Sequence, residues 1–184
     1  QGEDIYAAAA VIEELCQGGP SMAGPFIHAA FYGGLNISEN GSKEQKETLL
    51  PKLARGEMFL CYGLSEPNVG GDLPSVETRV TRDGDEIVIN GAKRWCTGAD
   101  WSDYIYCLCR SGGPEDRHGN LTFVLVPTNA PGVSMQPIAH SNLRYTDSMD
   151  VFLDDVRLPA SAIVGGPDKW NKGWEALAGR ALDV

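Results

Sequence analysis

Apolar residues near the start of the chain recur every three or four positions, which is the period of an amphipathic helix. The clearest run comprises Ile5, Ala8, Val11, Ile12 and Leu15. Two glycines and a proline, at 18–20, follow this run and should end the helix. A second helical stretch, 21–37, contains many small residues and stops before Gly41. The pattern therefore predicts at least two helices in this part of the chain.

A third helix is predicted to begin after Ser42. Ser42 and Gln45 stand three residues apart, as in a capping box, in which each side chain binds the other residue's backbone N–H. The helix should cover Lys43–Ala54. Pro51 lies inside this range, and because proline has no backbone N–H, we expect a break or a restarted turn there.

From Met58 the apolar period changes to two, which indicates β-strands. The predicted strands are 58–64, 76–82, 86–89, 92–97, 104–109, 121–126, 133–138 and 149–156. Asp83-Gly84 is a hairpin signal, and Asn90-Gly91 indicates a further turn. About eight short strands at this spacing are typical of an antiparallel sandwich or barrel. Helical character returns at 169–184, so we expect an α+β fold.

Composition and charge exclude several classes of function. The 184 residues include 25 acidic and 15 basic side chains, and the net charge of −10 disfavours binding to nucleic acid through a basic patch. No apolar run reaches the roughly 18 residues that span a bilayer, and no signal peptide is visible, so we expect no membrane insertion. The chain starts without Met and ends in a short helical stretch, which indicates a chain cut at both ends.

The cysteines and histidines predict no metal site. Five cysteines, an odd number, are scattered through apolar segments, which favours reduced thiols in a cytosol-like compartment. The three histidines lie far apart and form no ligand motif with the cysteines.

The segment 62–72 is the first candidate for chemistry. It leaves a strand and contains the adjacent glycines Gly70 and Gly71 together with the hydroxyl of Ser65. Successive backbone N–H groups in such a loop can hold an anion or a pyrophosphate. The alternative is a tight connection that uses Pro67 and the two glycines only for its geometry.

The segment 90–97 is the second candidate. Trp95 and Thr97 stand two residues apart, so a strand would place both side chains on one face. The indole could then press against an aromatic ligand while the hydroxyl reaches a ring heteroatom. The alternative is a tryptophan in the hydrophobic core.

Together these segments resemble the signatures of the acyl-CoA dehydrogenase family, flavoenzymes that oxidise acyl-CoA thioesters. The sequence L-S-E-P-x-x-G-G-D at 64–72 is similar to the family's T-E-P-x-x-G-S-D, and N-G-x-K-x-W-C-T at 90–97 is similar to N-G-x-K-x-W-I-T. Further similar segments are V-I-E-E-L at 11–15, G-S-K-E-Q at 41–45, L-P-x-L-x-x-G-E at 50–57, D-D-V-R-L-P at 154–159 and G-W at 173–174. The resemblance covers nearly the whole chain.

The resemblance implies a domain order. Residues 1–56 would be part of an N-terminal helical domain, residues 57–164 a middle antiparallel β-barrel, and residues 165–184 the beginning of a C-terminal helical domain. FAD would lie between the barrel and the C-terminal helices.

The resemblance also implies roles for single residues. Tyr62, Leu64 and Ser65 would line the flavin, and Gly70 and Gly71 would approach the pyrophosphate. Trp95 would pack beside the isoalloxazine, with Cys96 and Thr97 at its N5 and O4 edge. Within 144–150, Asp147 and Ser148 would contact the acyl-CoA, as would Gly71. These expected site residues are Tyr62, Leu64, Ser65, Gly70, Gly71, Trp95, Cys96, Thr97, Asp147 and Ser148.

The chain departs from the family pattern at three positions, the first two of which are expected site residues. Gly71 stands where a serine is usual, Cys96 where an isoleucine is usual, and Gly98 where an asparagine or serine is usual. The family's catalytic base is a glutamate of the C-terminal helical domain, beyond residue 184. Glu66 beside Pro67 is better suited to a structural hydrogen-bonding role, so no catalytic residue is assigned to this chain.

The function implied by the resemblance is that of an FAD-dependent acyl-CoA dehydrogenase, in a chain that would not complete the reaction alone. It would pass electrons to an electron-transfer flavoprotein and assemble as a dimer or tetramer, in the cytoplasm or in a eukaryotic mitochondrial matrix. Two alternatives stay open. One is an oxygen-using relative, such as an acyl-CoA oxidase or a flavin monooxygenase, and the other is a non-catalytic, flavin-poor partner subunit.

Overall fold

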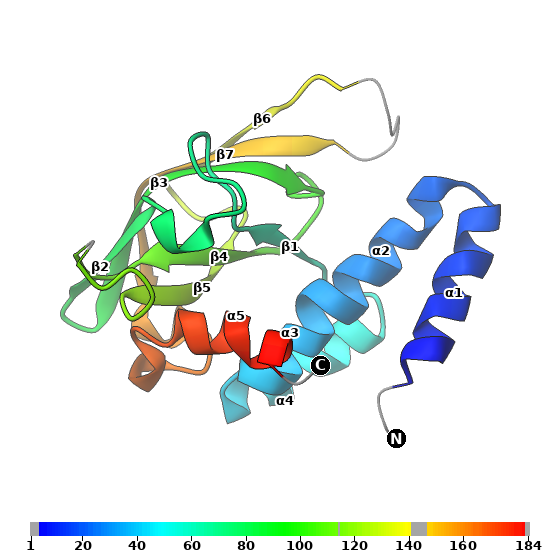
Figure 1. Ribbon diagram of the computed structural model, residues 1–184, viewed down its shortest axis with the longest axis horizontal. Helices are drawn as coiled ribbons and strands as arrows, with labels where there is room; N and C mark the ends of the chain where they lie inside the picture. Colours follow the sequence, from blue (N-terminus) through cyan, green and yellow to red (C-terminus); the bar gives the residue numbers. More distant parts are fainter. Residues whose placement is uncertain (1–3, 114, 141–146, 183–184) are drawn as a thin grey trace.

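The computed structural model describes residues 4–113, 115–140 and 147–182. Helices from the first third of the chain stand beside a curved sheet. The last helix, Gly173–Leu182, lies below the sheet in this view and near the helix at Asn36–Asn40 (Figure 1). The α+β class predicted from the sequence is confirmed. None of the described helices is long and apolar enough to cross a membrane.

The first two helical predictions hold, with one irregularity. Helix α1 covers Ile5–Gln17 and ends at the predicted glycines. The second stretch is a continuous rod made of α2 (Gly24–Ile27), a π-helix (His28–Leu35) and α3 (Asn36–Asn40). His28 is buried, and its Nδ1 donates to the Leu60 carbonyl at 2.9 Å, which fastens the rod to the sheet.

Helix α4, Lys43–Ala54, begins with the predicted capping box. The Gln45 N–H donates to Ser42 Oγ at 3.2 Å, and the Ser42 N–H donates to Gln45 Oε1 at 3.0 Å. The break expected at Pro51 is wrong, because the helix continues through it. The missing N–H removes a single hydrogen bond near the C-terminal end, while Leu49 and Leu53 on either side remain packed in the core.

Removal of the capping hydroxyl should weaken α4. Ser42→Ala is expected to lower the free energy of unfolding by about 0.5–2 kcal/mol, because the Gln45 N–H loses its acceptor. Urea denaturation of the two proteins measures the difference. Ser38→Ala is the matched control, since its exposed hydroxyl only donates back to the Leu35 carbonyl. An equal loss in both variants would contradict this role for the cap.

Seven strands form one sheet. Their bounds are β1 Leu60–Gly63, β2 Arg79–Asp83, β3 Glu86–Thr97, β4 Tyr104–Arg110, β5 Leu121–Pro127, β6 Val133–Pro137 and β7 Ser148–Pro159. The order is β1-β4-β2-β3-β7-β6, and β5 pairs with the other edge of β4. Apolar side chains fill both faces of the curved sheet, and helix α5 (Gly173–Leu182) covers part of the face that also packs against α4.

The prediction of an antiparallel barrel is wrong in two respects. The sheet is mixed, because β1 runs parallel to β4 over Leu60–Gly63 and β2 meets β4 in parallel at Arg79. It is also an open half-barrel, since β5 and β6 are not paired with each other in the described part of the chain. Alternating apolar residues show which side of a strand is buried, but they do not encode the direction of its neighbours.

The turn predicted at Asn90-Gly91 is wrong, whereas the hairpin at Asp83-Gly84 is confirmed. Strand β3 continues through Asn90 with a register irregularity beside Gly91. The Asn90 side chain bonds across to β7, where Nδ2 donates to Asp155 Oδ1 and Oδ1 accepts from the Asp155 N–H, both at 2.9 Å. Two predicted strands therefore merge, and the sheet has seven strands rather than about eight.

Candidate functional site

A small cleft opens where β1 and β3 end beside the π-helix. Its volume is about 190 Å³. The cleft is lined by Tyr32, Tyr62, Leu64, Ser65, Arg94, Trp95 and Thr97. The structure therefore brings together five of the residues that the sequence analysis singled out, from two segments about 30 positions apart.

The first wall is the end of β1 and the loop after it. Gly63 is required here because a Cβ would lie 2.7 Å from Ile105 Cγ2 on the neighbouring strand. The chain then leaves the sheet, and a turn between Glu66 and Val69 closes with N–H to carbonyl bonds of 2.8 and 3.2 Å in the two directions. This turn holds Leu64 and Ser65 at the rim of the cleft.

The second wall is a bulge near the end of β3. Lys93 pairs with Val151 and Cys96 with Met149, so two residues of β3 oppose Asp150 alone. Trp95 lies in this bulge with a φ of +62°, a strained conformation for a large aromatic residue. The bulge turns the indole outward, and 55% of Trp95 is exposed.

Arg94 lies against the outward-facing indole. Its guanidinium carbon is 5.1 Å from the centroid of the Trp95 ring, within the range of a cation–π contact. Its Nε is also 3.6 Å from Asp150 Oδ1, so the cation is held by groups on both β3 and β7. Arg94 is not among the site residues expected from the sequence, although its position next to Trp95 was a signal.

Thr97 and Ser148 face each other across β3 and β7. Their hydroxyl oxygens are 2.8 Å apart, and the two residues are a register pair. Asp147 directly precedes Ser148. Its carbonyl accepts from the Gly98 N–H at 2.9 Å, and its exposed carboxylate lies 3.6 Å from His140 Nε2. Positions 144–146 of the predicted acyl-CoA segment lie outside the described residues.

The π-helix supplies the remaining wall. The Tyr32 ring stacks on Tyr62 with centroids 4.2 Å apart and planes 23° apart. The Asn36 amide donates to Tyr62 Oη at 2.5 Å and to the carbonyls of Phe31 and Tyr32 at 3.1 Å. π-Helical turns are often found at functional sites. Tyr32 was missed by sequence reasoning because a regular helix was expected there.

A buried ion pair lies between the two walls. Lys93 Nζ donates to Glu66 Oε1 at 2.8 Å and to the Leu64 carbonyl at 3.3 Å, while the Glu66 carboxylate accepts from the N–H groups of Glu77 and Thr78 at 2.6 and 2.8 Å. Burial alone would raise the pKa of Glu66, but Lys93 and these hydrogen bonds outweigh it and lower that pKa. Glu66 is not among the residues that line the cleft.

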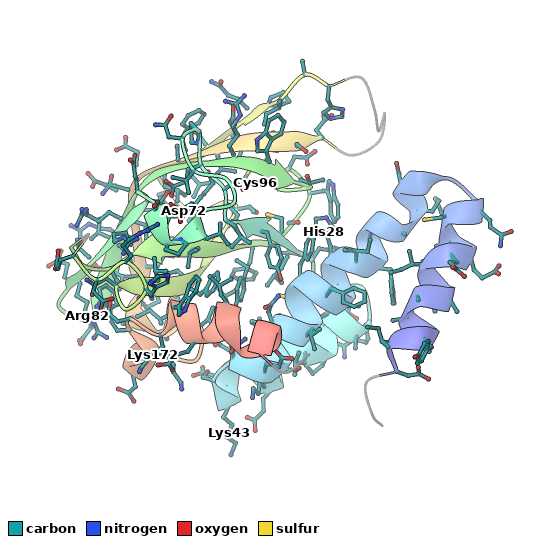
Figure 2. The ribbon with its side chains drawn as sticks, viewed as in Figure 1. His28, Lys43, Asp72, Arg82, Cys96 and Lys172 are labelled. Carbon is teal, nitrogen blue, oxygen red and sulfur yellow. The ribbon has the colours of Figure 1, made fainter. Side chains whose placement is uncertain are left out.

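Five expected site residues lie outside the cleft lining: Asp147 and Ser148, described above, and Gly70, Gly71 and Cys96. Gly70 and Gly71 are on an exposed loop, where a Cβ would meet no atom within 4 Å, so this backbone is open to close approach. The Cys96 side chain points into the core, as Figure 2 shows, and burial raises the pKa of its thiol. Only the backbone of Cys96 could therefore contact a ligand in the cleft.

The cleft fits a planar ring that carries polar atoms at its edge. Trp95 offers an exposed aromatic surface, and Ser65 and Thr97, which carry hydroxyls, line the same cleft. Aromatic faces bind planar rings by offset stacking, and hydroxyls can donate to ring heteroatoms. An isoalloxazine has both properties. Among the described residues, no three histidine, cysteine or acidic side chains are placed to hold a metal ion.

Comparison with known proteins identifies the family. The family model for the acyl-CoA dehydrogenase middle domain matches residues 61–156, and that for the acyl-CoA dehydrogenase N-terminal domain matches residues 1–57. The probable acyl-CoA dehydrogenase YngJ of Bacillus subtilis is 32% identical over 172 residues, which are 93% of this chain and 45% of that protein.

Solved structures agree. The ChsE4-ChsE5 complex from Mycobacterium tuberculosis matches with 30% identity and a TM-score of 0.74, covering 91% of this chain and 43% of the other. A glutaryl-coenzyme A dehydrogenase in complex with glutaryl-CoA shares the fold, with a TM-score of 0.83 at 23% identity, over 92% of this chain and 42% of the other. The chain spans less than half the length of these relatives. It belongs to the acyl-CoA dehydrogenase family.

Proposed function

We propose that this chain forms the β-domain side of the FAD site in an acyl-CoA dehydrogenase, an enzyme that introduces an α,β double bond into an acyl-CoA thioester. The observation that carries the proposal is the convergence of Ser65, Trp95 and Thr97 on one cleft. Two sequence segments, at the end of β1 and at the end of β3, supply these residues, and each strand pairs with a different partner. The strained bulge at Trp95 keeps the indole exposed.

The residues of this chain would bind and orient the cofactor. Trp95 would stack on the flavin ring, and Ser65 and Thr97 would donate hydrogen bonds to its polar edge. The open backbone at Gly70 and Gly71 would approach the pyrophosphate, without the hydroxyl that a serine at position 71 would add. FAD, when bound, accepts the electron pair that leaves the substrate.

The substrate would approach from the side of β7. Ser148 lies at hydrogen-bond distance from Thr97, and the Asp147 carboxylate is exposed beside it, so both could contact an acyl-CoA thioester. No carboxylate lines the cleft among the residues that the structure describes. We therefore assign binding and orientation to this chain and no proton transfer.

Partners follow from the same proposal. Reduced flavin needs an electron acceptor, and we propose an electron-transfer flavoprotein. We also propose that the chain works in an oligomer, because one of its matched structures is a complex of two named components, ChsE4 and ChsE5. The glycine at position 71 favours a second candidate, a partner subunit with weak flavin binding.

Two measurements test the proposal. The first is the visible flavin spectrum of the chain after incubation with FAD and gel filtration. The second is anaerobic addition of an acyl-CoA to the assembled enzyme that contains this chain. Loss of the flavin's visible absorbance would support a dehydrogenase. Retained flavin without loss of absorbance, across short, long and branched acyl-CoA thioesters, would contradict this function.

The hydroxyl of Ser65 should contribute to affinity for FAD. Ser65→Ala is expected to raise the Kd for FAD about 2- to 12-fold, which corresponds to the loss of one neutral hydrogen bond. Fluorescence titration with FAD measures the change. Ser134→Ala, an exposed serine on β6, is the matched control and should leave the Kd unchanged. An unchanged Kd in Ser65→Ala would remove this residue from the site.

A further inference from the structure

We infer that Lys93 and Glu66 are positioning residues that fix the distance and orientation between the two walls of the cleft. The inference rests on the proposed function, because it explains how this chain presents Ser65 and Trp95 to a flavin. Neither residue lines the cleft, so they would act through their neighbours.

The pair joins the two walls at the positions next to the ligand-facing residues. Glu66 follows Ser65 directly, and Lys93 is two residues before Trp95. The Lys93 side chain is 0% exposed, and its ammonium contacts both the Glu66 carboxylate and the Leu64 carbonyl. The Arg94 N–H adds a backbone bond of 2.9 Å to the Ser65 carbonyl. All three bonds run from the Trp95 wall to the Ser65 wall.

Glu66 is itself held from a third direction. Its two carboxylate oxygens accept from the successive N–H groups of Glu77 and Thr78, in the segment that leads into β2. Thr78 Oγ1 in turn donates to the Ala92 carbonyl at 3.2 Å, directly before Lys93. The carboxylate therefore closes a ring of contacts between the Ser65 loop, the approach to β2 and the bulge of β3.

Stability alone does not account for an ion pair in this place. A buried pair loses the hydration of two charges, and apolar residues of similar size often stabilise a protein equally well. The pair does supply fixed geometry beside a strained residue. Trp95 keeps its φ of +62° only if its surroundings enforce it, and Lys93 anchors the strand immediately before the bulge. The geometry points to orientation of the indole as the role of the pair.

The test compares binding and local structure with stability. Lys93→Met removes the ammonium and keeps most of the side-chain volume, and Glu66→Gln is a milder change that keeps one carbonyl oxygen. Lys43→Met is the matched control, because Lys43 projects from the start of α4 with 89% of its side chain exposed (Figure 2). Circular dichroism selects a temperature at which each protein is folded.

Two quantities are then measured at that temperature. One is the Kd for FAD. The other, measured without FAD, is acrylamide quenching of Trp95 fluorescence, taken as the difference between each protein and its counterpart with Trp95→Phe. A purely structural pair would change the unfolding midpoint and leave both quantities as they are in the parent chain.

The positioning role predicts that Lys93→Met raises the Kd for FAD by about tenfold or more and changes the quenching of Trp95, because the indole leaves its orientation. Glu66→Gln should change both in the same direction by a smaller factor, and Lys43→Met should change neither. A Kd within about twofold of the parent, with unchanged quenching in both cleft variants, would overturn the inference.

The two proposals fail in distinguishable ways. If the parent chain binds no FAD, the proposed function fails for this chain, and quenching of Trp95 still decides whether the pair positions the indole. If the parent binds FAD and the variants bind it equally well, the proposed function stands and the positioning role is wrong. Should Lys93→Met not fold, Glu66→Gln gives both quantities.

Discussion

Replacement of Glu66 by alanine is expected to lower the free energy of unfolding by about 3–5 kcal/mol, because it leaves the buried Lys93 ammonium without a counter-charge. The N–H groups of Glu77 and Thr78 lose their acceptor at the same time. Chemical denaturation of the parent and the variant measures the difference. Glu57→Ala is the matched control, since Glu57 pairs with Arg55 on the exposed surface and its loss should leave stability nearly unchanged.

The effect of this variant should depend on pH. The folded-state pKa of Glu66 lies below its ordinary value of 4.5. The stability that its carboxylate contributes is therefore fully present above about pH 4.5, and it is lost as the pH falls through the lower folded-state pKa. The difference between parent and Glu66→Ala should shrink in acid. A difference that stays constant from neutral pH into that acidic range would show that the carboxylate's charge is not what stabilises this site.

Gly91→Ala is expected to lower the free energy of unfolding by about 2–4 kcal/mol, because it combines backbone strain with a steric clash. Gly91 has a φ of +147°, and a Cβ there would lie 2.6 Å from the Thr78 Cα, which is backbone and cannot turn away. Thermal or urea denaturation measures the loss.

Gly70→Ala is the control for this prediction. No atom lies within 4 Å of a Cβ at position 70, so its stability should stay within about 0.5 kcal/mol of the parent. If Gly91→Ala were as stable as Gly70→Ala, the close approach of Thr78 to β3 would be wrong. That result would also contradict the ring of contacts around Glu66, because this ring includes Thr78.

Local signals in the sequence predicted the helices and most strands. The capping box at Ser42 and the glycines after Gln17 act through contacts between near neighbours, so the helix ends can be deduced from the chain alone. Pro51 shows the limit of this reasoning. The cost of one missing hydrogen bond is local, but the packing of Leu49 and Leu53 that offsets it is tertiary.

The sheet could be predicted only in part, because its topology depends on partners far away in the chain. Asn90-Gly91 has the composition of a turn, yet its asparagine bonds to Asp155 on β7, 65 positions away, and the strand continues. The parallel pairing of β1 with β4 is likewise invisible in the alternation of apolar residues. The parallel pairing makes the sheet mixed, and the sheet stays open because β5 and β6 are not paired with each other in the described part of the chain.

The residues of the candidate site that belong to sequence motifs could be predicted, and the others could not. Ser65, Trp95 and Thr97 lie in segments that resemble family signatures, and the structure places them in one cleft. Tyr32 and Arg94 complete the lining and were missed. Tyr32 lies in a π-helix, where the sequence pattern predicted a regular helix. Arg94 is identified by its contacts with Trp95 and Asp150, which only the structure shows.

Whether the cleft at Trp95 holds the flavin ring can be decided by the amount of FAD that co-elutes with the chain in gel filtration. The comparison is between the parent chain, Trp95→Leu, and Phe152→Leu as an exposed aromatic control on β7. We expect the parent and Phe152→Leu to retain the yellow cofactor at one FAD per chain and Trp95→Leu to lose most of it. Equal retention in the parent and Trp95→Leu, or no retention by the parent, would contradict a flavin site in this cleft.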